Sequence, residues 1–186
     1  MNYLEEAIEL LRNGEVIASR TDTVYGLLAD ATNDNAVRKS FILKQRPFSK
    51  SLIVLVNSIE MAKEIANMTQ KQEAIAKELW IEKRRTVTLI FKLKLPSCIS
   101  RFVFGEKDTI AIRLPRDKFC LDLINGLDNP IIAPSANISD HPTAITAQMV
   151  KEDFGDKIPL IIDEGNCTAL PSEIIDLTQI IPVRIR

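Results

Sequence analysis

The hydrophobic pattern of the chain begins with a helical period. Apolar side chains within residues 2–13 share one helical face, namely Leu4, Ala7, Ile8 and Leu11. Gly14 follows them, and glycine often ends a helix. Residues 16–18 then predict a short buried strand that leads directly to Thr21, Asp22 and Thr23. Because ligands of open α/β sheets commonly bind at strand ends, we expect these hydroxyl groups near a binding site.

The next segment predicts a second helix and a central strand. Asn33 or Asp34 can cap a helix that runs to about Gln45, and we expect Pro47 to end it. The apolar run at residues 51–56 is too short for a buried helix and too apolar for a half-exposed strand. It therefore predicts a central strand that is covered on both faces.

The remaining chain continues to alternate between helices and strands. Helices are expected after the caps Ser58, Thr69 and Thr146. The helix after Thr69 should end near Trp80, and the helix after Thr146 near Phe154. A further helix is expected over residues 117–126, ended by Gly126. Strands are expected at residues 86–95, 109–114, 130–133, 160–163, 172–177 and 183–186. This order predicts one α/β domain over residues 1–186, with a mixed sheet.

Composition narrows the possible functions. A chain of 186 residues is long enough for one domain with a substantial core. It carries 24 Lys and Arg against 25 Asp and Glu, so any anion site must be local and broad attraction to RNA is disfavoured. An acidic N-terminus and the lack of a long apolar stretch predict a soluble, cytoplasmic protein without a membrane anchor.

The cysteines do not form a recognisable framework. They are Cys98, Cys120 and Cys167, far apart and without a CxxC pair. This spacing argues against a disulfide scaffold and a zinc ribbon, and we interpret all three as buried apolar residues.

Candidate metal ligands are also few. The only histidine, His141, precedes Pro142, so a histidine-rich metal site is excluded and a catalytic triad is disfavoured. Asp163 and Glu164 are adjacent but lack a third oxygen ligand in sequence. The sequence therefore favours a magnesium ion that bridges substrate phosphates over a protein cage.

A phosphate site would have to be built from side chains, because the six glycines leave no GxGxxG and no Walker A loop. Lys44, Arg46 and Lys50 lie around the predicted helix end. Arginine offers a bidentate fork to phosphate oxygens, and lysine adds a mobile charge. A solvated basic helix end is the alternative interpretation.

Three further features have both a structural and a functional interpretation. Ser135 and Asn137 suit the orientation of a polar ligand, but such residues also fill turns. Arg113 interrupts an apolar strand, and a buried arginine needs a partner. Residues 83–85, Lys-Arg-Arg, either contact RNA phosphates or form a solvated loop.

Five segments carry a family resemblance when they are taken together. They are TDTVYGL (21–27), KQRPFSKSL (44–52), IAIRLP (110–115), PSANIS (134–139) and PSEIIDLT (171–178). In order and spacing, from about Gly14 to Arg186, they resemble the YrdC-like family of threonylcarbamoyl-AMP synthases. The resemblance implies an α/β fold with a twisted mixed sheet, flanking helices and a deep concave cleft. It also implies a nucleotidyltransferase that converts L-threonine, bicarbonate and ATP to threonylcarbamoyl-AMP and pyrophosphate, for tRNA modification at adenosine 37.

By position, the resemblance divides the site into two parts. The implied threonine contacts are Thr23, Arg113, Ser135 and Ser172, with the substrate carboxylate as the partner of Arg113. The implied nucleotide contacts are Lys44, Arg46, Lys50, Asn137, Thr143 and Arg186, of which the first three are the catalytic phosphate contacts. A carbamate made from threonine and bicarbonate attacks the α-phosphate, so the protein needs mainly to position two anions and stabilise the departing pyrophosphate. Magnesium would be bound through the phosphates, and downstream tRNA-modification proteins are implied partners.

Three segments depart from the family pattern. Ser19 and Arg20 replace an aromatic residue and a proline, while Leu28 replaces a common glycine. WIEKRRTVT, which includes residues 81–87, replaces a Trp-Pro-Gly-Pro region, and Asp140 follows Ser139 where a glycine is usual. A paralogue that binds RNA or a nucleotide without turnover, and a related reaction on a different amine, remain alternatives. The end at Arg186 implies the short, single-domain form.

Overall fold

The computed structural model describes residues 3–168 and 171–186, and strands run through the whole of this part of the chain. The strands are β1 (Ile17–Arg20), β2 (Tyr25–Asp30), β3 (Ile53–Leu55), β4 (Ala66–Asn67), β5 (Val87–Leu93), β6 (Thr109–Arg113), β7 (Ile131–Ile132), β8 (Ile161–Ile162), β9 (Glu173–Asp176) and β10 (Val183–Arg184). They form one sheet in the order β10-β9-β5-β6-β3-β7-β2-β1-β8, with β4 paired to β5 outside this path. Parallel pairs, such as β3 with β6, and antiparallel pairs, such as β1 with β2, both occur, so the predicted mixed sheet is confirmed.

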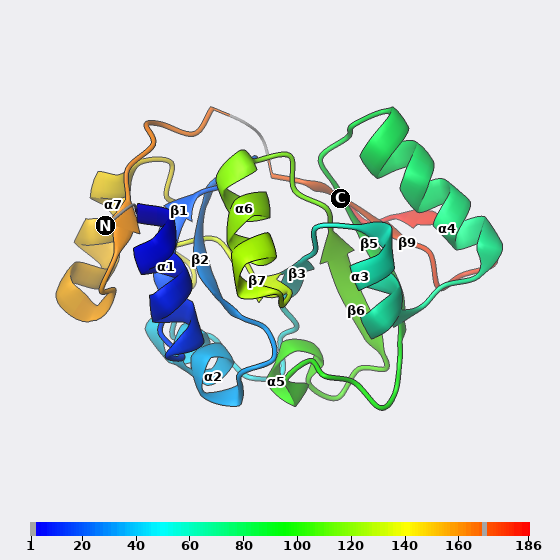
Figure 1. Cartoon of the computed structure of the whole chain (residues 1–186), viewed down its shortest axis with the longest axis horizontal. Helices are drawn as coiled ribbons and strands as arrows, with labels where there is room; N and C mark the ends of the chain where they lie inside the picture. The colour runs from blue at the N-terminus through cyan, green and yellow to red at the C-terminus, as the bar shows by residue number, and fades with distance from the viewer. Residues whose placement is uncertain (1–2, 169–170) are drawn as a thin grey trace.

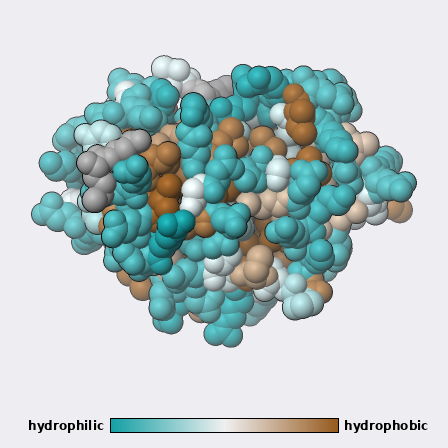
Figure 2. Space-filling model, viewed as in Figure 1, coloured by the Kyte–Doolittle hydropathy of each residue, from teal (hydrophilic) through white to brown (hydrophobic). Residues whose placement is uncertain are grey.

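Helices cover this sheet (Figure 1). They are α1 (Tyr3–Arg12), α2 (Asp34–Leu43), α3 (Ile59–Ile65), α4 (Gln70–Ala76), α5 (Arg101–Phe104), α6 (Lys118–Leu127) and α7 (Ala147–Phe154), with a π-helix at Lys77–Glu82 and a 3-10 turn at Gly155–Lys157. Helices α1 and α6 pack against each other on the near side of Figure 1. In the same view, Figure 2 shows a mostly hydrophilic surface with hydrophobic side chains visible in narrow strips, as expected for amphipathic helices over a sheet.

Strand β3 shows why the apolar run at 51–56 was correctly predicted to be central. Val54 and Val56 belong to the larger hydrophobic cluster, whereas Leu55 belongs to the cluster beneath α1 and α6. Successive side chains of a strand point to opposite faces, so both faces of β3 are buried. This strand lies between β6 and β7 in the middle of the sheet.

The predicted helix caps are confirmed. Asn33 accepts hydrogen bonds from the backbone of Asn35 and Ala36 at the start of α2. Ser58, Thr69 and Thr146 cap α3, α4 and α7, and Thr69 forms a capping box with Gln72. These residues satisfy backbone N–H groups that have no partner within the helix.

Two predicted helix ends are wrong. Helix α2 ends at Leu43, before Pro47, because Gln45 adopts a left-handed conformation with φ 50°. Helix α6 runs through Gly126 to Leu127 and ends at Asp128, which has φ 58°. Gly126 instead permits close packing of α1, since an added Cβ would overlap Ile8 Cδ1.

The sequence interpretation also missed elements and misplaced one cysteine. Strands β2 and β4 and the short helix α5 were not predicted. Cys120 and Cys167 are buried as expected, but Cys98 is exposed, because it lies in the loop between β5 and α5. Within the described residues, no helix combines the length and the apolar character needed to cross a bilayer. The assignment of residues 1–186 to a single domain stays a prediction.

Candidate functional site

A pocket of about 220 Å³ gathers most of the predicted site residues. We call it the Arg46 pocket. Its lining includes Thr23, Lys44, Arg46, Arg113, Ser135, Thr143, Ser172 and Arg186. These residues come from the β1–β2 turn, the end of α2, the end of β6, the segment after β7 and the two sides of β9 and β10. The fold therefore assembles one site from residues distant in sequence, while the deep concave cleft stays a prediction.

The end of α2 delivers two cations to this pocket. Arg46 N donates to Phe41 O at 3.0 Å, and Gln45 N donates to Ile42 O at 3.1 Å. This pair of hydrogen bonds is a Schellman motif with Gln45 in the left-handed position. The chain reverses sharply there, so Lys44 and Arg46 both line the pocket although only one residue separates them.

Lys44 is buried and its amino group is held by the protein. Nζ donates to the backbone oxygens of Ser135 and Asn137, the latter at 2.7 Å, and lies 3.4 Å from Asn137 Oδ1. Burial, together with the nearby charge of Arg46, lowers the pKa of Lys44 to about 8. An ammonium group has three donors, so these contacts leave none of them clearly free. Lys44 thus fixes the 135–137 turn against the end of α2.

Arg46 is half-buried and has unused donors. Nη2 donates to Ser51 O at 3.2 Å, while Nε is buried without a hydrogen-bond partner. Burial lowers the pKa of the guanidinium from its ordinary value. A buried donor without a partner is costly, so an anion in the pocket would be stabilised here.

Arg113 corrects one expectation, because the chain itself supplies its partner. Nη2 lies 3.3 Å from Asp22 Oδ1, and Nη1 donates to Thr23 Oγ1 at 3.3 Å. The Arg113 and Asp22 side chains are only 4% and 7% exposed. Sequence reasoning missed the role of Asp22, and its place between two threonines at a strand end was the only signal. Arg113 Nε is buried without a hydrogen-bond partner, which leaves one donor for a ligand.

The β1–β2 turn is internally braced. Thr21 Oγ1 donates to Val24 O at 2.8 Å and lies 3.0 Å from Thr23 Oγ1. Gly26 follows, and an added Cβ there would lie 3.1 Å from Thr21 Cγ2. Gly26 also pairs with Ser135 in an isolated bridge, so this close approach keeps the Thr23 hydroxyl and Ser135 beside each other.

The far side of the pocket is formed around β9. Ser172 is buried, and its Oγ lies 2.9 Å from Thr88 Oγ1. Arg186 Nε donates to Ser172 O at 3.0 Å. Thr143 is exposed at the edge of the pocket, next to Ala144, whose oxygen accepts from Tyr25 N at 3.1 Å.

Two predicted site residues do not line the pocket. Lys50 is exposed in the loop after Pro47. Asn137 is buried, and its Nδ2 donates to Ile138 O and His141 O, both at 2.9 Å. Asn137 therefore supports the loop that holds Lys44. His141 also lies outside the lining and pairs with Asp153 at 2.8 Å.

The electrostatics of the Arg46 pocket favour an anion. The lining carries four cationic side chains, Lys44, Arg46, Arg113 and Arg186, and no Asp or Glu. Three of them are oriented by backbone oxygens and the fourth by Asp22. Pre-oriented cations in a partly buried pocket act strongly on a charged ligand because solvent screens them little. Among the residues described, no group of three His, Cys, Asp or Glu side chains gathers in a way that would hold a metal ion.

The mixed α/β fold of this chain is similar to the folds of Sua5 and YciO. The model of the Sua5/YciO/YrdC family, described as Telomere recombination, matches residues 9–186, and the chain belongs to this family. The family resemblance seen in the sequence is therefore confirmed.

Relatives with assigned names support the same placement. The chain is 38% identical over 182 residues to the threonylcarbamoyl-AMP synthase of Pyrococcus abyssi, which covers 97% of this chain and 52% of the relative. It is 31% identical over 179 residues to the enzyme of the same name from Enterobacter sp. strain 638, covering 95% of this chain and 92% of the relative. The chain spans about half the length of the Pyrococcus abyssi relative and of a Bacillus subtilis relative.

Solved structures extend the comparison to three dimensions. Pyrococcus abyssi Sua5 complexed with L-threonine matches with a TM-score of 0.91 and 37% identity, over 98% of this chain and 53% of that one. E. coli YciO matches with a TM-score of 0.84 and 22% identity, over 99% and 88%. The second likeness shows the fold alone.

Proposed function

We propose that this chain is a nucleotidyltransferase that forms threonylcarbamoyl-AMP from L-threonine, bicarbonate and ATP, with release of pyrophosphate. One observation carries the proposal: the Arg46 pocket combines hydroxyl groups with two arginines, Arg46 and Arg113, whose Nε donors have no partner. Family membership and the names of relatives that this chain covers almost fully support it. A cytoplasmic location and a role in tRNA modification at adenosine 37 are part of the same proposal.

The amino acid would be held where the β1–β2 turn meets β6. The Arg113 guanidinium, with its free Nε, would bind the carboxylate of threonine, and Thr23 and Ser135 would contact its polar groups. Ser172 would contact the substrate from the opposite wall. Because Asp22 already neutralises part of the charge of Arg113, the site suits a zwitterionic amino acid better than a dianion.

The nucleotide would lie towards the end of α2. Arg46 is the proposed main phosphate contact, since its buried Nε lacks a partner and arginine matches phosphate bidentately. Lys44 would attract the phosphates by its charge while it holds the turn at Ser135. Thr143 and Arg186 would contact the nucleotide at the edge of the Arg46 pocket. Lys50 and Asn137 are proposed as a mobile outer contact and as a support for Lys44, respectively.

The proposed chemistry has two steps, and neither needs a histidine base. The amine of threonine forms an N–C bond to the carbon of bicarbonate, and water leaves, which gives a carbamate. A carbamate oxygen then forms a bond to the α-phosphorus of ATP while the bond to the β-phosphate oxygen breaks and pyrophosphate leaves with the electron pair. The cations of the pocket would stabilise the charge that develops on this leaving group. Magnesium would enter bound to the phosphate oxygens of ATP.

The test is release of pyrophosphate by the purified protein in the presence of threonine, bicarbonate, ATP and magnesium. We expect threonine-dependent release in the wild type and little in Arg46→Ala, while Lys151→Ala, which removes an exposed lysine from α7, serves as a matched surface control. Pyrophosphate release by the wild type that is no higher than release by Arg46→Ala would refute the proposal. Salt-sensitive RNA binding without turnover would instead support the paralogue that binds without catalysis, and a screen of other amino acids would identify a different amine substrate.

A further inference from the structure

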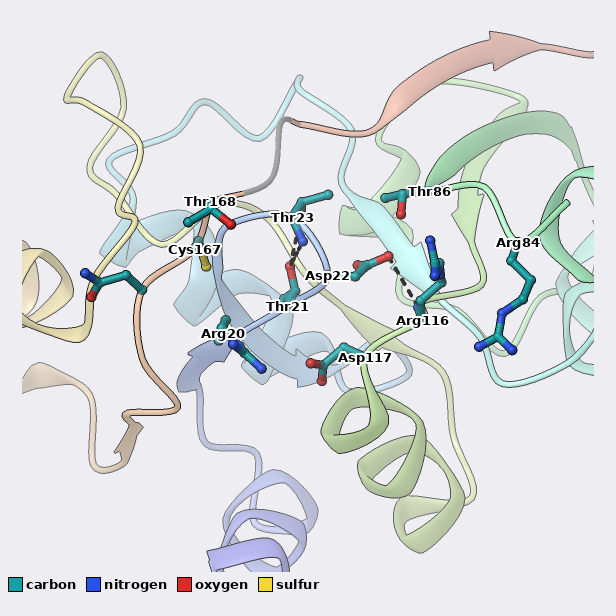
Figure 3. A pocket seen from close by; sticks show the side chains of 11 residues that line it. Arg20, Thr21, Asp22, Thr23, Arg84, Thr86, Arg116, Asp117, Cys167 and Thr168 are labelled. Carbon is teal, nitrogen blue, oxygen red and sulfur yellow. Dashed lines mark hydrogen bonds between the residues drawn. The ribbon is translucent and has the colours of Figure 1, made fainter.

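A second pocket is lined in part by residues of the β1–β2 turn (Figure 3). We call it the Arg84 pocket. It has a volume of about 340 Å³, and Thr23 lines both this pocket and the Arg46 pocket. Its charged lining residues are Arg20, Asp22, Arg84, Arg116 and Asp117. None of the residues with an implied family role, apart from Thr23, lines it.

Two of the segments that depart from the family pattern meet in this pocket. Arg20 replaces a family proline at the end of β1, and Arg84 and Thr86 belong to the segment that replaces the Trp-Pro-Gly-Pro region. These positions are far apart in sequence, yet they line one cavity. Three of the residues that depart from the family pattern, Arg20, Arg84 and Thr86, therefore belong to one site, whereas Ser19, Leu28 and Asp140 do not line it.

The arginines of the Arg84 pocket have no charged partner. Among residues 3–168 and 171–186, the side chains of Arg20, Arg84 and Arg116 form no ion pair and no hydrogen bond, although the backbone N–H of Arg116 donates to Asp22. Arg20 Nε is also buried without a hydrogen-bond partner. Such a donor costs free energy unless a ligand binds it. By contrast Arg85, next in sequence, pairs with Glu173 and does not line the pocket.

The two carboxylates of the Arg84 pocket are already engaged elsewhere. Asp22 faces Arg113 with one oxygen and accepts from Arg116 N at 3.3 Å with the other. Asp117 caps α6 by accepting from Cys120 N at 2.9 Å. Both carboxylates remain charged, so the three arginines and two aspartates of the lining leave an excess of one positive charge.

We propose that the Arg84 pocket binds a small phosphate anion of about the size of pyrophosphate. In Figure 3, Arg20 and Arg84 stand towards opposite sides, with Arg116 and the carboxylates of Asp22 and Asp117 between them. The hydroxyls of Thr21 and Thr86 lie nearby. Cations spread in this way fit an anion whose charge is distributed over two phosphate groups. Guanidinium and hydroxyl donors are the groups that bind phosphate oxygens. A nucleic-acid strand fits less well, because the net charge of the chain is −1 and the arginines line a cavity.

This inference goes beyond the proposed reaction and does not depend on it, because the two pockets have different arginines. Binding can be measured without threonine, bicarbonate or turnover. The Arg46→Ala background removes the phosphate contact of the Arg46 pocket and isolates the Arg84 pocket. If the wild type releases no pyrophosphate from ATP but Arg46→Ala protein binds pyrophosphate, the proposed reaction is refuted and the proposed anion site is retained.

Calorimetric titration of Arg46→Ala protein with pyrophosphate at physiological ionic strength is the direct test. We expect one pyrophosphate per chain, and binding weaker by about tenfold or more when Arg84→Ala or Arg20→Ala is added, as for loss of a charge-assisted hydrogen bond. Arg85→Ala is the matched control and should leave the affinity unchanged. Loss of all binding in Arg46→Ala alone, or equal binding in the Arg84→Ala and parent proteins, would overturn the proposal.

Inorganic phosphate should bind more weakly than pyrophosphate. A single-stranded RNA oligonucleotide that binds more tightly and depends on Arg84 would overturn the assignment to a small anion.

Discussion

The Arg46 pocket and the Arg84 pocket share the β1–β2 turn but treat their cations differently. In the Arg46 pocket, Lys44, Arg46 and Arg186 donate to backbone oxygens, and Arg113 faces Asp22. In the Arg84 pocket, the arginines have no such partners among the described residues. The cations of the first pocket are thus oriented by the fold, whereas the arginine side chains of the second have no partner that orients them.

The contrast teaches how a family site and a local variation can coexist. Residues that match the family motifs occupy the pocket whose geometry is held by β-strand ends and the end of α2. Among the departures, Arg20, Arg84 and Thr86 line the neighbouring pocket, and neither Arg20 nor Arg84 takes part in the hydrogen bonds and the ion pair that orient the cations of the first. Four substitutions test this difference between the pockets, from the largest expected effect to the smallest.

Removal of Arg113 should have the largest effect, because it leaves Asp22 buried without its charge partner. We expect Arg113→Ala to lower the free energy of unfolding by about 3–5 kcal/mol and to abolish threonine-dependent pyrophosphate release. Urea denaturation measures the stability. Adding Asp22→Asn should restore a large part of it, and a single variant as stable as the wild type would show that the pair does not brace the Arg46 pocket.

Lys44 should give the Arg46 pocket a distinctive pH dependence. Its pKa is lowered to about 8 in the folded protein, mainly by burial, so the unfolded chain binds the proton more tightly. Between pH 8 and the ordinary lysine value, the unfolded state therefore holds more protons and stability rises with pH. Relative to Lys44→Met, the free energy of unfolding of the wild type should increase by about 3 kcal/mol between pH 8 and the ordinary lysine pKa. Denaturation at several pH values measures the difference, and a constant difference would contradict it.

Arg46 should matter for catalysis without affecting stability. Its side chain is half-buried and makes one hydrogen bond to Ser51 O, so Arg46→Ala should fold normally. We expect kcat/KM for ATP to fall about 100-fold, as for loss of one donor to a developing charge. Lys50→Ala is the matched control, because Lys50 is exposed outside the pocket lining, and it should change kcat/KM much less. An equal loss in both variants would mean that the lining does not define the phosphate site.

Asp140 should give the smallest effect, because this departure lines neither pocket. It adopts φ 70°, a left-handed conformation in which a glycine is unstrained. Asp140→Gly should therefore change the thermal stability by at most about 1 kcal/mol and leave pyrophosphate binding unchanged. The neighbouring control, Ser139→Gly, lacks a positive φ and should only destabilise. Altered binding in Asp140→Gly would connect this loop to the Arg84 pocket.

Local physics made much of the fold predictable. The run at 51–56 has one interpretation, because a short segment that is apolar on both faces must be a central strand. The capping residues Asn33, Ser58 and Thr69 predict where their helices begin. Strand β2 escaped prediction because it is buried at every position and opens directly from a polar turn. Its burial depends on pairing with β7, which is distant in sequence, and with β1, from which the polar turn separates it.

The site was predictable only in part. The family motifs identified most residues of the Arg46 pocket, but not the partner of Arg113, because Asp22 approaches it only when β1, β2 and β6 are folded. The Arg84 pocket was not predictable, since nothing local connects Arg20 with Arg84. The sequence marked both as departures without showing that they line one cavity.

The end of α2 also has a consequence for which substitutions the chain tolerates. Gln45 is exposed, and its side chain lines neither pocket, so a search for functional side chains would pass over it. Yet its φ of 50° creates the reversal that brings Lys44 and Arg46 to the same pocket. Glycine or asparagine fits this backbone, whereas a β-branched residue is strained there. Natural variation at this position should therefore be restricted by backbone geometry, in the same way as a buried residue is restricted by packing.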